Sequence, residues 1–262
     1  MTPLSVVIIT YNEERNIGRC IDSVLPIADE IIILDSFSQD NTVKIAYEKG
    51  AIIKQSTFEG YINQKNMAIS LASNNYVLLM DADESLTTQL CQSIKDEKLD
   101  FKFKAYSMKR CSRFCGIFIK YGLWYPDKKI RLFDKTIGIC GGFNPHDRII
   151  LDNDIKVREL KGDLLHFAFD SFEEYYSRNE EVSSIAAKSL YEADIKPPWT
   201  KIILSPCWAF INGYLFRLGF LNGYRGFIIA LYTSKQSYAK YYKLKQLKKQ
   251  TYKRLIWNNL ET

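Results

Sequence analysis

The sequence lacks several features that mark whole classes of protein. It has no run of about 18 uncharged apolar residues, and its longest apolar segment, 202–216, contains Pro206 and Asn212, so a membrane-spanning helix is not expected. The six cysteines show no C-x-x-C spacing and the first twelve residues lack a secretory signal, which favours a reducing cytosol. There is no phosphate-binding loop of the G-x-x-x-x-G-K-S type.

Acidic residues are also missing from one part of the chain. Residues 195–260 contain no Asp or Glu but 12 Lys and Arg, whereas residues 1–194 hold 24 basic and 29 acidic residues. The whole chain is 47% hydrophobic and 25% charged, which is typical of a globular protein. We therefore expect one large domain over 1–194 and a basic appendage over 195–262.

The first hundred residues alternate between short β-branched runs and helical patterns. This alternation predicts an α/β fold with a doubly wound, mainly parallel sheet. The expected strands are Leu4–Thr10, Glu30–Asp35, Ala51–Lys54 and Tyr76–Met80, and the expected helices run from Asn12 to Pro26, from Asp40 or Asn41 to Lys49, and from Gln64 to Ala72. Beyond residue 100 the pattern predicts antiparallel strands over one sheet edge, followed by a helix over Phe172–Leu190.

Polar residues follow three of the expected strands, at 10–13, 35–40 and 81–84. Ligands of open α/β sheets bind at the carboxyl ends of the strands. Asp81 and Asp83 lie two positions apart and therefore point to one side of the chain. Because paired carboxylates repel each other, this spacing favours Mg²⁺ or Mn²⁺ completed by substrate phosphate oxygens. Capping of the next helix is the alternative role for Asp40 or Asn41.

Seven motifs carry a resemblance to a known family. The chain resembles the family 2 glycosyltransferases with the GT-A fold over about residues 4–190, and in particular the bacterial lipopolysaccharide-core glycosyltransferases. The motifs are S-V-V-I-I-T-Y-N-E-E at 5–14, L-D-S-F-S-Q-D-N-T at 34–42, G-Y-I-N-Q-K-N at 60–66, L-L-M-D-A-D-E at 78–84, W-Y-P-D-K-K-I-R-L-F at 124–133, G-G-F-N-P-H-D at 141–147 and L-L-H-F at 164–167.

The resemblance implies a nucleotide-sugar half over about 1–100, with UDP-sugar as the expected donor. Tyr11 and the backbone of its neighbours would pack on uracil, and an acidic side chain would accept hydrogen bonds from uracil or ribose. Lys65 would meet the base or a phosphate, and Asp81 would reach the ribose or a metal-bound water. The complete set of expected donor residues is Thr10, Tyr11, Asn12, Glu13, Asp35, Lys65 and Asp81.

The same resemblance implies a metal and a base. Asp83 would hold Mg²⁺ or Mn²⁺ on the donor diphosphate, and His166 would complete the metal shell. His146-Asp147 matches the dipeptide that supplies the catalytic base, with Asp in place of the commoner Glu. Asp147 is then the expected general base for single displacement with inversion. Its alternative role is a pair with Arg148.

The acceptor half, about 101–194, offers weaker candidates. Trp124 and Tyr125 would stack on a sugar ring and Arg131 would touch the diphosphate or pair with a carboxylate, and His146 could face the donor. The alternatives are a core position for Trp124 and a surface strand position for Arg131. Zinc binding by three of the cysteines with His146 is disfavoured by their spacing, and buried, unreactive thiols are preferred; those cysteines are Cys111, Cys115 and Cys140.

The basic appendage is also aromatic, with 14 aromatic residues between 195 and 260. Trp and Tyr favour the headgroup zone of a bilayer, and Lys and Arg are attracted to anionic lipid. We expect a helical extension that attaches to the inner face of the bacterial cytoplasmic membrane. Packing on the catalytic domain is the alternative, while nucleic acid is not an expected partner because no recognised motif accompanies the charge.

These observations predict an inverting, metal-dependent glycosyltransferase that moves a sugar from a nucleotide donor to a lipid-linked saccharide. A sugar-phosphate nucleotidyltransferase would want a Gly-rich basic loop after the first strand, and Y-N-E-E-R-N at 11–16 does not supply it. A non-catalytic nucleotide-sugar or polyanion-binding protein is the other alternative. Intact Asp81, Asp83 and Asp147 speak against it.

Overall fold

A computed structural model describes residues 1–143, 146–196 and 199–260. The chain divides into two compact units. The first combines Met1–Arg113, Tyr125–Gly142 and His146–Ala168, and the second contains Phe114–Trp124 and the chain from Phe169 onward. The structural boundary near 169 therefore lies before the compositional boundary near 195.

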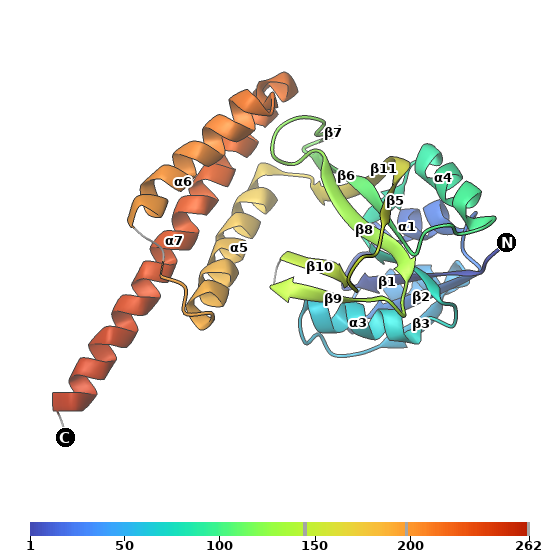
Figure 1. Ribbon diagram of the computed structural model, residues 1–262, viewed down its shortest axis with the longest axis horizontal. Coiled ribbons are helices and arrows are strands. Elements are labelled where there is room, and N and C mark those ends of the chain that lie inside the picture. The colour runs from blue at the N-terminus through green and yellow to red at the C-terminus, as the bar shows by residue number, and fades with distance from the viewer. Residues whose placement is uncertain (144–145, 197–198, 261–262) are drawn as a thin grey trace. The chain divides into compact units, whose positions relative to one another are not determined.

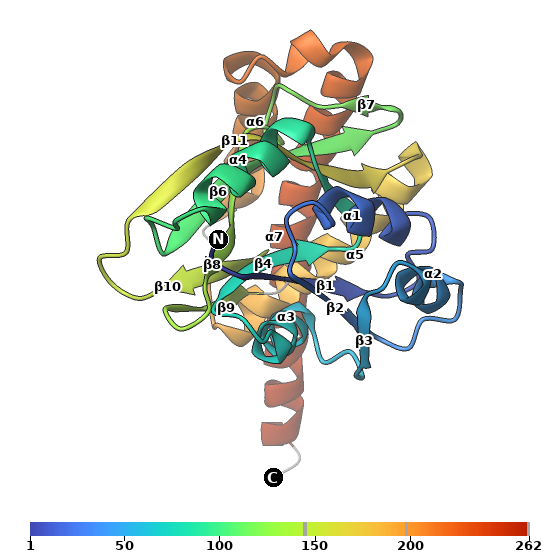
Figure 2. The same ribbon diagram turned by 90° about the vertical axis from the view of Figure 1, so that its right-hand side faces the viewer.

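The first unit is built on one mixed sheet (Figures 1 and 2). Its strands run in the order β3-β2-β1-β4-β8-β6-β11-β5, and β9 and β10 form a separate pair. The bounds are β1 Leu4–Thr10, β2 Glu30–Asp35, β3 Ile52–Gln55, β4 Tyr76–Asp81, β5 Glu84–Leu86, β6 Ala105–Phe114, β8 Asp127–Asp134, β9 Gly138–Phe143, β10 His146–Leu151 and β11 Val157–Phe169.

The first four strands are parallel, as the alternation predicted, and β8 joins them antiparallel beside β4. In this register Thr10 lies opposite Asp35, and Ile9 lies opposite Asp81. The polar ends of β1, β2 and β4 therefore meet at one edge of the sheet.

Apolar side chains of β1 pack on both faces of the sheet. Leu4, Val6 and Ile8 share a core with α1 (Ile17–Val24) and α4 (Thr88–Lys98). Val7 and Ile9 share the opposite core with α3 (Tyr61–Leu71) and the β9-β10 hairpin. Because every residue of β1 is buried, a short β-branched run is the pattern such a central strand requires.

The helix expected from Asn12 begins instead at Ile17. The N-cap position of α1 is occupied by Asn16, and Asn12, with a φ of 54°, lies four residues earlier in the loop, so its predicted role as a helix cap is wrong. Its amide donates to Ser38 Oγ at 2.8 Å, and its Oδ1 accepts from the Gln39 amide at 2.7 Å. Asn12 thus joins the loops that follow β1 and β2. Helix α2 (Thr42–Glu48) begins near its expected start.

The second unit is mainly helical. Helix α5 (Phe172–Glu192) begins with a capping box formed by Ser171 and Glu174, and α7 (Gly223–Leu260) packs against both α5 and α6 (Trp199–Ile211). Lys243 of α7 contacts Glu180 of α5 at 2.8 Å. No helix in the described part of the chain is long and apolar enough to cross a bilayer.

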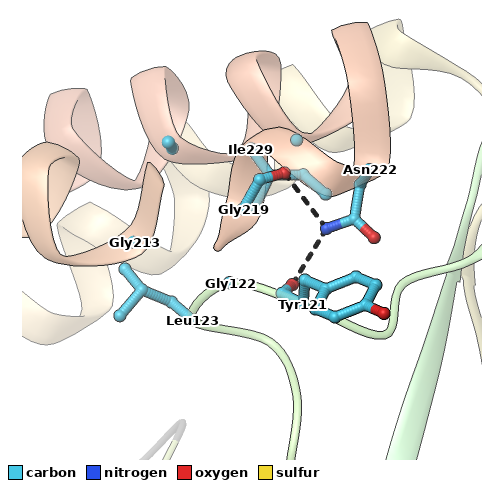
Figure 3. A pocket seen from close by; sticks show the side chains of 9 residues that line it. Tyr121, Gly122, Leu123, Gly213, Gly219, Asn222 and Ile229 are labelled. Atoms are coloured by element: carbon cyan, nitrogen blue, oxygen red, sulfur yellow. Dashed lines mark hydrogen bonds between the residues drawn. The ribbon is translucent and has the colours of Figure 1, made fainter. Parts of the chain in front are cut away.

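The turn between α6 and α7 contains a π-helical turn, η1 (Asn212–Phe216), and a 3-10 turn, η2 (Gly219–Asn222). The backbones approach so closely here that a Cβ on Gly219 would lie 2.4 Å from the carbonyl oxygen of Gly213. Asn222 Nδ2 donates to the carbonyl oxygens of Tyr121 at 3.0 Å and Gly219 at 3.3 Å (Figure 3). We call this clamped turn, residues 212–222, the hairpin tip.

Gly162 on β11 tests how tightly the first unit is packed. Its φ is +97°, and an added Cβ would lie 2.4 Å from the Leu90 amide nitrogen of α4. We predict that Gly162→Ala lowers the free energy of unfolding by about 3 kcal/mol or more, because backbone strain and a steric clash add. The measurement is urea denaturation.

Gly50→Ala is the matched control, because Gly50 has a φ of +80° and nothing lies within 4 Å of the added Cβ. It carries the strain without the clash, so a loss of about 1 kcal/mol is expected. Equal losses in the two variants would contradict the packing argument.

Candidate active site

The edge where β1, β2 and β4 end carries the predicted donor residues. Asp35 is fully buried and accepts hydrogen bonds from the Ser38 amide at 3.0 Å and from Gln55 Nε2 at 2.9 Å. Asp35 therefore helps to hold the loop after β2 in its conformation by accepting a hydrogen bond from it. Tyr11 is exposed beside this loop, whereas Thr10 is buried and its Oγ1 has no hydrogen-bond partner within the described residues.

A chain of ion pairs crosses the end of β4. Asp81 Oδ2 accepts from Arg131 Nη2 of β8 at 2.7 Å, and Asp81 Oδ1 lies 3.1 Å from Lys65 Nζ of α3. Lys65 Nζ also donates to Asp147 Oδ2 of β10 at 2.8 Å. Lys65 and Arg131 are both buried, so Arg131 does not occupy the surface strand position that was its alternative. We call these four residues the ion-pair network.

The ion-pair network shifts the pKa values of Asp81 and Lys65. Burial alone would raise the pKa of the Asp81 carboxyl, but Lys65 and Arg131 hold it far below its ordinary value. Burial likewise lowers the pKa of the Lys65 ammonium, but Asp81 and Asp147 raise it, and the net shift is upward. These groups are therefore charged at neutral pH.

Glu84 adds a further buried carboxylate beside Arg131. Its side chain is fully buried, and Oε1 accepts from Arg131 Nη2 at 2.7 Å while Oε2 accepts from the Asp81 amide at 3.0 Å. Arg131 thus pairs with two carboxylates, which is the second of the roles predicted for it. Glu84 was not among the predicted site residues, although it ends the D-A-D-E motif.

Asp83 and His166 lie side by side. His166 Nε2 is 3.2 Å from Asp83 Oδ2, and its Nδ1 is 2.9 Å from Ser112 Oγ of β6. His166 lies inside β11, where it is the register partner of Glu84 on the antiparallel strand β5. Burial raises the pKa of the nearby Glu13 carboxyl, and the charge of Asp83 adds to the shift.

This pair has the donor types that a divalent cation takes, a carboxylate and an imidazole. Among residues that the structure describes, no group of three or more His, Cys, Asp or Glu side chains is arranged to hold a metal. A cation bound by Asp83 and His166 would therefore need further ligands, which substrate oxygens supply in many phosphate-binding sites.

Asp147 is held over α3 by its own hairpin. Asn66 of α3 donates from Nδ2 to the Cys140 carbonyl oxygen at 2.9 Å and accepts from the Cys140 amide at 2.8 Å. This clamp on β9 fixes the hairpin that brings Asp147 to Lys65. Asn66 was missed as a site residue, although it follows Lys65 in the G-Y-I-N-Q-K-N motif.

The cysteines take no part in a nucleophilic arrangement that the structure describes. All six are free thiols, and Cys140 Sγ lies 3.8 Å from Asp147 Oδ2. Burial, aided by the charge of Asp147, raises the pKa of the Cys140 thiol to about 11. Cys140 is therefore a protonated thiol at neutral pH and a poor nucleophile.

The acceptor candidates fall in different places. Trp124 belongs to the second unit, where it packs edge-on against Phe114 and Tyr175, as its alternative role as a core anchor predicted. Tyr125 belongs to the first unit and donates from its hydroxyl to Asp163 Oδ1 at 3.0 Å. The side chain of His146 lies outside the described residues.

Comparison with known proteins decides the family. The model of glycosyl transferase family 2 matches residues 5–151. The chain belongs to this glycosyltransferase family. An uncharacterized glycosyltransferase of Rickettsia typhi is 30% identical, over 94% of this chain and 88% of its own. The lipopolysaccharide core biosynthesis glycosyltransferase LpsC of Rhizobium meliloti is 29% identical, over 87% of each chain.

Solved structures agree on the fold of this glycosyltransferase. The mannosyltransferase PcManGT of Pyrobaculum calidifontis, solved with GDP-Man and Mn²⁺, has a TM-score of 0.54 at 14% identity and covers 93% of this chain and 87% of its own. Glucosyl-3-phosphoglycerate synthase of Mycobacterium tuberculosis has a TM-score of 0.51 at 18% identity, over 75% and 81%. The predicted GT-A fold is confirmed.

Arg131 should be the main stabilising cation of the ion-pair network. Arg131→Met removes the guanidinium that hydrogen-bonds both Asp81 and Glu84 in a buried site. Among the described cations Glu84 then keeps only Arg110, at 3.8 Å, so we predict a loss of about 3–5 kcal/mol of unfolding free energy, measured by chemical denaturation. Lys49→Met is the control, because Lys49 pairs with Asp22 at the surface, where a loss below about 1 kcal/mol is expected. Similar losses in both variants would refute the buried-pair argument.

Proposed function

We propose that this glycosyltransferase is an inverting, metal-dependent enzyme that moves a sugar from a nucleotide donor, UDP-sugar in the first place, to a lipid-linked saccharide. The observation that carries the proposal is the contact of Asp83 with His166 near Glu13. This contact lies near the sheet edge where β1 ends at Thr10 and β2 ends at Asp35. Family membership supports sugar transfer, and the following steps assign the parts.

The donor nucleoside would bind at the ends of β1 and β2. Tyr11 is exposed and free to stack on a base, and the unpartnered Thr10 Oγ1 is a buried group that a bound ligand can satisfy. Glu13, whose carboxyl has a raised pKa, is the better placed acidic partner for uracil or ribose, because Asp35 already accepts bonds from its own loop.

Asp83 and His166 would hold Mg²⁺ or Mn²⁺ together with the donor diphosphate. The mannosyltransferase of similar fold contains Mn²⁺ with GDP-Man, which supports the same class of cofactor here. A cation in that position offsets the negative charge that develops on the leaving nucleoside diphosphate. Asp81 belongs to the ion-pair network, so its role would be to fix Lys65 near the donor.

Asp147 would act as the general base. A sugar hydroxyl is a poor nucleophile at neutral pH, and a carboxylate on the far side of the anomeric carbon can take its proton as the new bond forms. Asp147 accepts a hydrogen bond from Lys65, so a pair with Arg148 is not its sole role. The contact with Lys65 orients the carboxylate. The protonated thiol of Cys140 gives no covalent route, in agreement with single displacement.

The acceptor class and location follow from the relatives and the charge. LpsC is named for lipopolysaccharide core biosynthesis, which supports a lipid-linked saccharide acceptor and a place on the inner face of the cytoplasmic membrane. The acid-free segment 195–260 would supply the attraction to anionic lipid. Residues 1–194 would then be the catalytic domain and 195–262 the membrane-associating extension.

Asp83→Asn tests the metal site. Because the variant loses a charged oxygen ligand, we predict that Mn²⁺ no longer strengthens UDP binding and that sugar transfer is abolished. Thermal shift with UDP, with and without Mn²⁺, measures the first effect without relying on activity. Asp96→Asn, an exposed change on α4, should behave as the parent protein. Undiminished Mn²⁺-dependent UDP binding in Asp83→Asn would remove Asp83 from the metal site.

Asp147→Asn tests the base. Loss of a positioned base should lower kcat by about 100-fold to 10,000-fold and leave donor affinity nearly unchanged. Transfer kinetics and UDP-sugar binding are both measured, with Asp152→Asn, an exposed change just after the same hairpin, as the control. Near-normal transfer would exclude Asp147 as the base, and lost donor binding would assign it to the donor site.

A further inference from the structure

The basic and aromatic extension divides into two parts with different surfaces. From 199 to 227 the only charged residues are Lys201, Arg217 and Arg225, whereas eight cations lie from Lys235 onward on α7 and one, Lys196, precedes both parts. The first part exposes large apolar side chains, and we call it the apolar segment. Its exposed members are Trp199, Ile203, Leu204, Trp208, Ile211, Leu215, Phe216, Leu218, Phe220, Leu221, Tyr224 and Phe227.

Helix α6 is apolar on the side that faces α7 and also carries large apolar side chains on the side turned away from it. Its contacts with α7 include a hydrogen bond between Ser205 Oγ and Ser237 Oγ at 2.8 Å and one from Ser234 Oγ to the Pro206 carbonyl oxygen at 2.9 Å. On the outer side Leu204 is 63% exposed and Trp208, one turn further along, is 59% exposed. A helix that folds only to cover a core keeps its outer side polar, so packing on α7 does not explain these exposed apolar side chains.

The hairpin tip continues the exposed surface. Phe216 is 68% exposed, and Leu215 and Leu218 beside it are exposed as well. The close contact of Gly213 with Gly219 and the Asn222 clamp hold the tip in one shape (Figure 3). A rigid apolar tip loses little conformational entropy when it enters an apolar phase.

Charge and residue type favour a bilayer as the occupant of this surface. The chain from 195 to 260 has no acidic residue, so its cations complement anionic headgroups. Lys243 and Lys248 are engaged by Glu180 and Asp194, while Lys245 and Lys249 are exposed. Trp and Tyr at the margin of an apolar surface are the residues that settle at a membrane interface.

We propose that the outer face of α6 and the hairpin tip insert into the acyl boundary of an anionic membrane, while the exposed lysines of α7 contact the headgroups. This proposal deepens the proposed function, because it names the element that brings the enzyme to a lipid-linked acceptor. The choice of a membrane as the partner rests on the proposed function. Attachment then has a salt-resistant apolar component in addition to a salt-sensitive one.

The test floats the full-length protein with phosphatidylcholine vesicles that contain or lack phosphatidylglycerol. Binding is measured at low salt and at about 0.5 M NaCl, where charge interactions are screened within about 4 Å. We expect the parent protein to stay on anionic vesicles at high salt. Trp208→Glu with Phe216→Glu should weaken binding by about tenfold or more at both salt concentrations.

Two control variants separate the components. Tyr47→Glu changes an exposed aromatic residue of α2 in the first unit and should bind as the parent does. Lys245→Gln with Lys249→Gln should weaken binding at low salt only. Complete release of the parent protein by salt, or parent-like binding of the Trp208→Glu, Phe216→Glu variant, would overturn the proposal.

Two further measurements distinguish the remaining outcomes. If sedimentation shows that the Trp208→Glu, Phe216→Glu change turns a dimer into a monomer without weakening vesicle binding, a second copy covers the face and the proposal fails. Hydrolysis of UDP-sugar without vesicles should be equal in the parent and this variant. If the parent itself hydrolyses no nucleotide-sugar but inserts as expected, the insertion stands and the proposed function fails.

Discussion

The ion-pair network around Asp81 is the constraint on which the rest of the first unit depends. A carboxylate delivered to a sheet edge by a buried strand needs positive partners, because an unpaired buried charge costs several kcal/mol. Lys65 comes from α3 and Arg131 comes from β8, the antiparallel strand that pairs with β4. The same lysine reaches Asp147 on the β9-β10 hairpin. These ion pairs therefore connect the parallel strands to β8 and to the β9-β10 hairpin, which come later in the chain.

Much of this unit follows from local sequence. A short, almost wholly apolar β-branched run suits a strand buried on both faces, so β1 was predicted with its observed bounds, Leu4–Thr10. Parallel pairing then brings the carboxyl ends of β1, β2 and β4 together, which is why Thr10, Asp35 and Asp81 were predicted to share an edge. These inferences need only side-chain period and strand direction, both of which are local properties.

The pairings across the site could not be read from the sequence. Asp147 was expected beside either a substrate hydroxyl or Arg148, and its contact with Lys65 joins residues 82 positions apart. Asn12 was misplaced for a similar reason, because the loop after β2 supplies its partners, Ser38 and Gln39. The boundary near 195 followed composition, whereas α5 belongs to the second unit through contacts with α7 that composition does not register.

The three carboxylates of the D-A-D-E motif have different partners in the structure. Glu84 is fully buried against Arg131, and Asp81 is shared by Arg131 and Lys65, so the protein's own cations neutralise both. Asp83 instead meets the imidazole of His166. The negative charges of Asp81 and Glu84 are already offset by guanidinium and ammonium groups, whereas a carboxylate beside an imidazole offers a divalent cation both negative charge and ligand types that it accepts. The buried pairs of Asp81 and Glu84 thus anchor the chain on both sides of Asp83, and this anchoring helps to set where Asp83 lies beside His166.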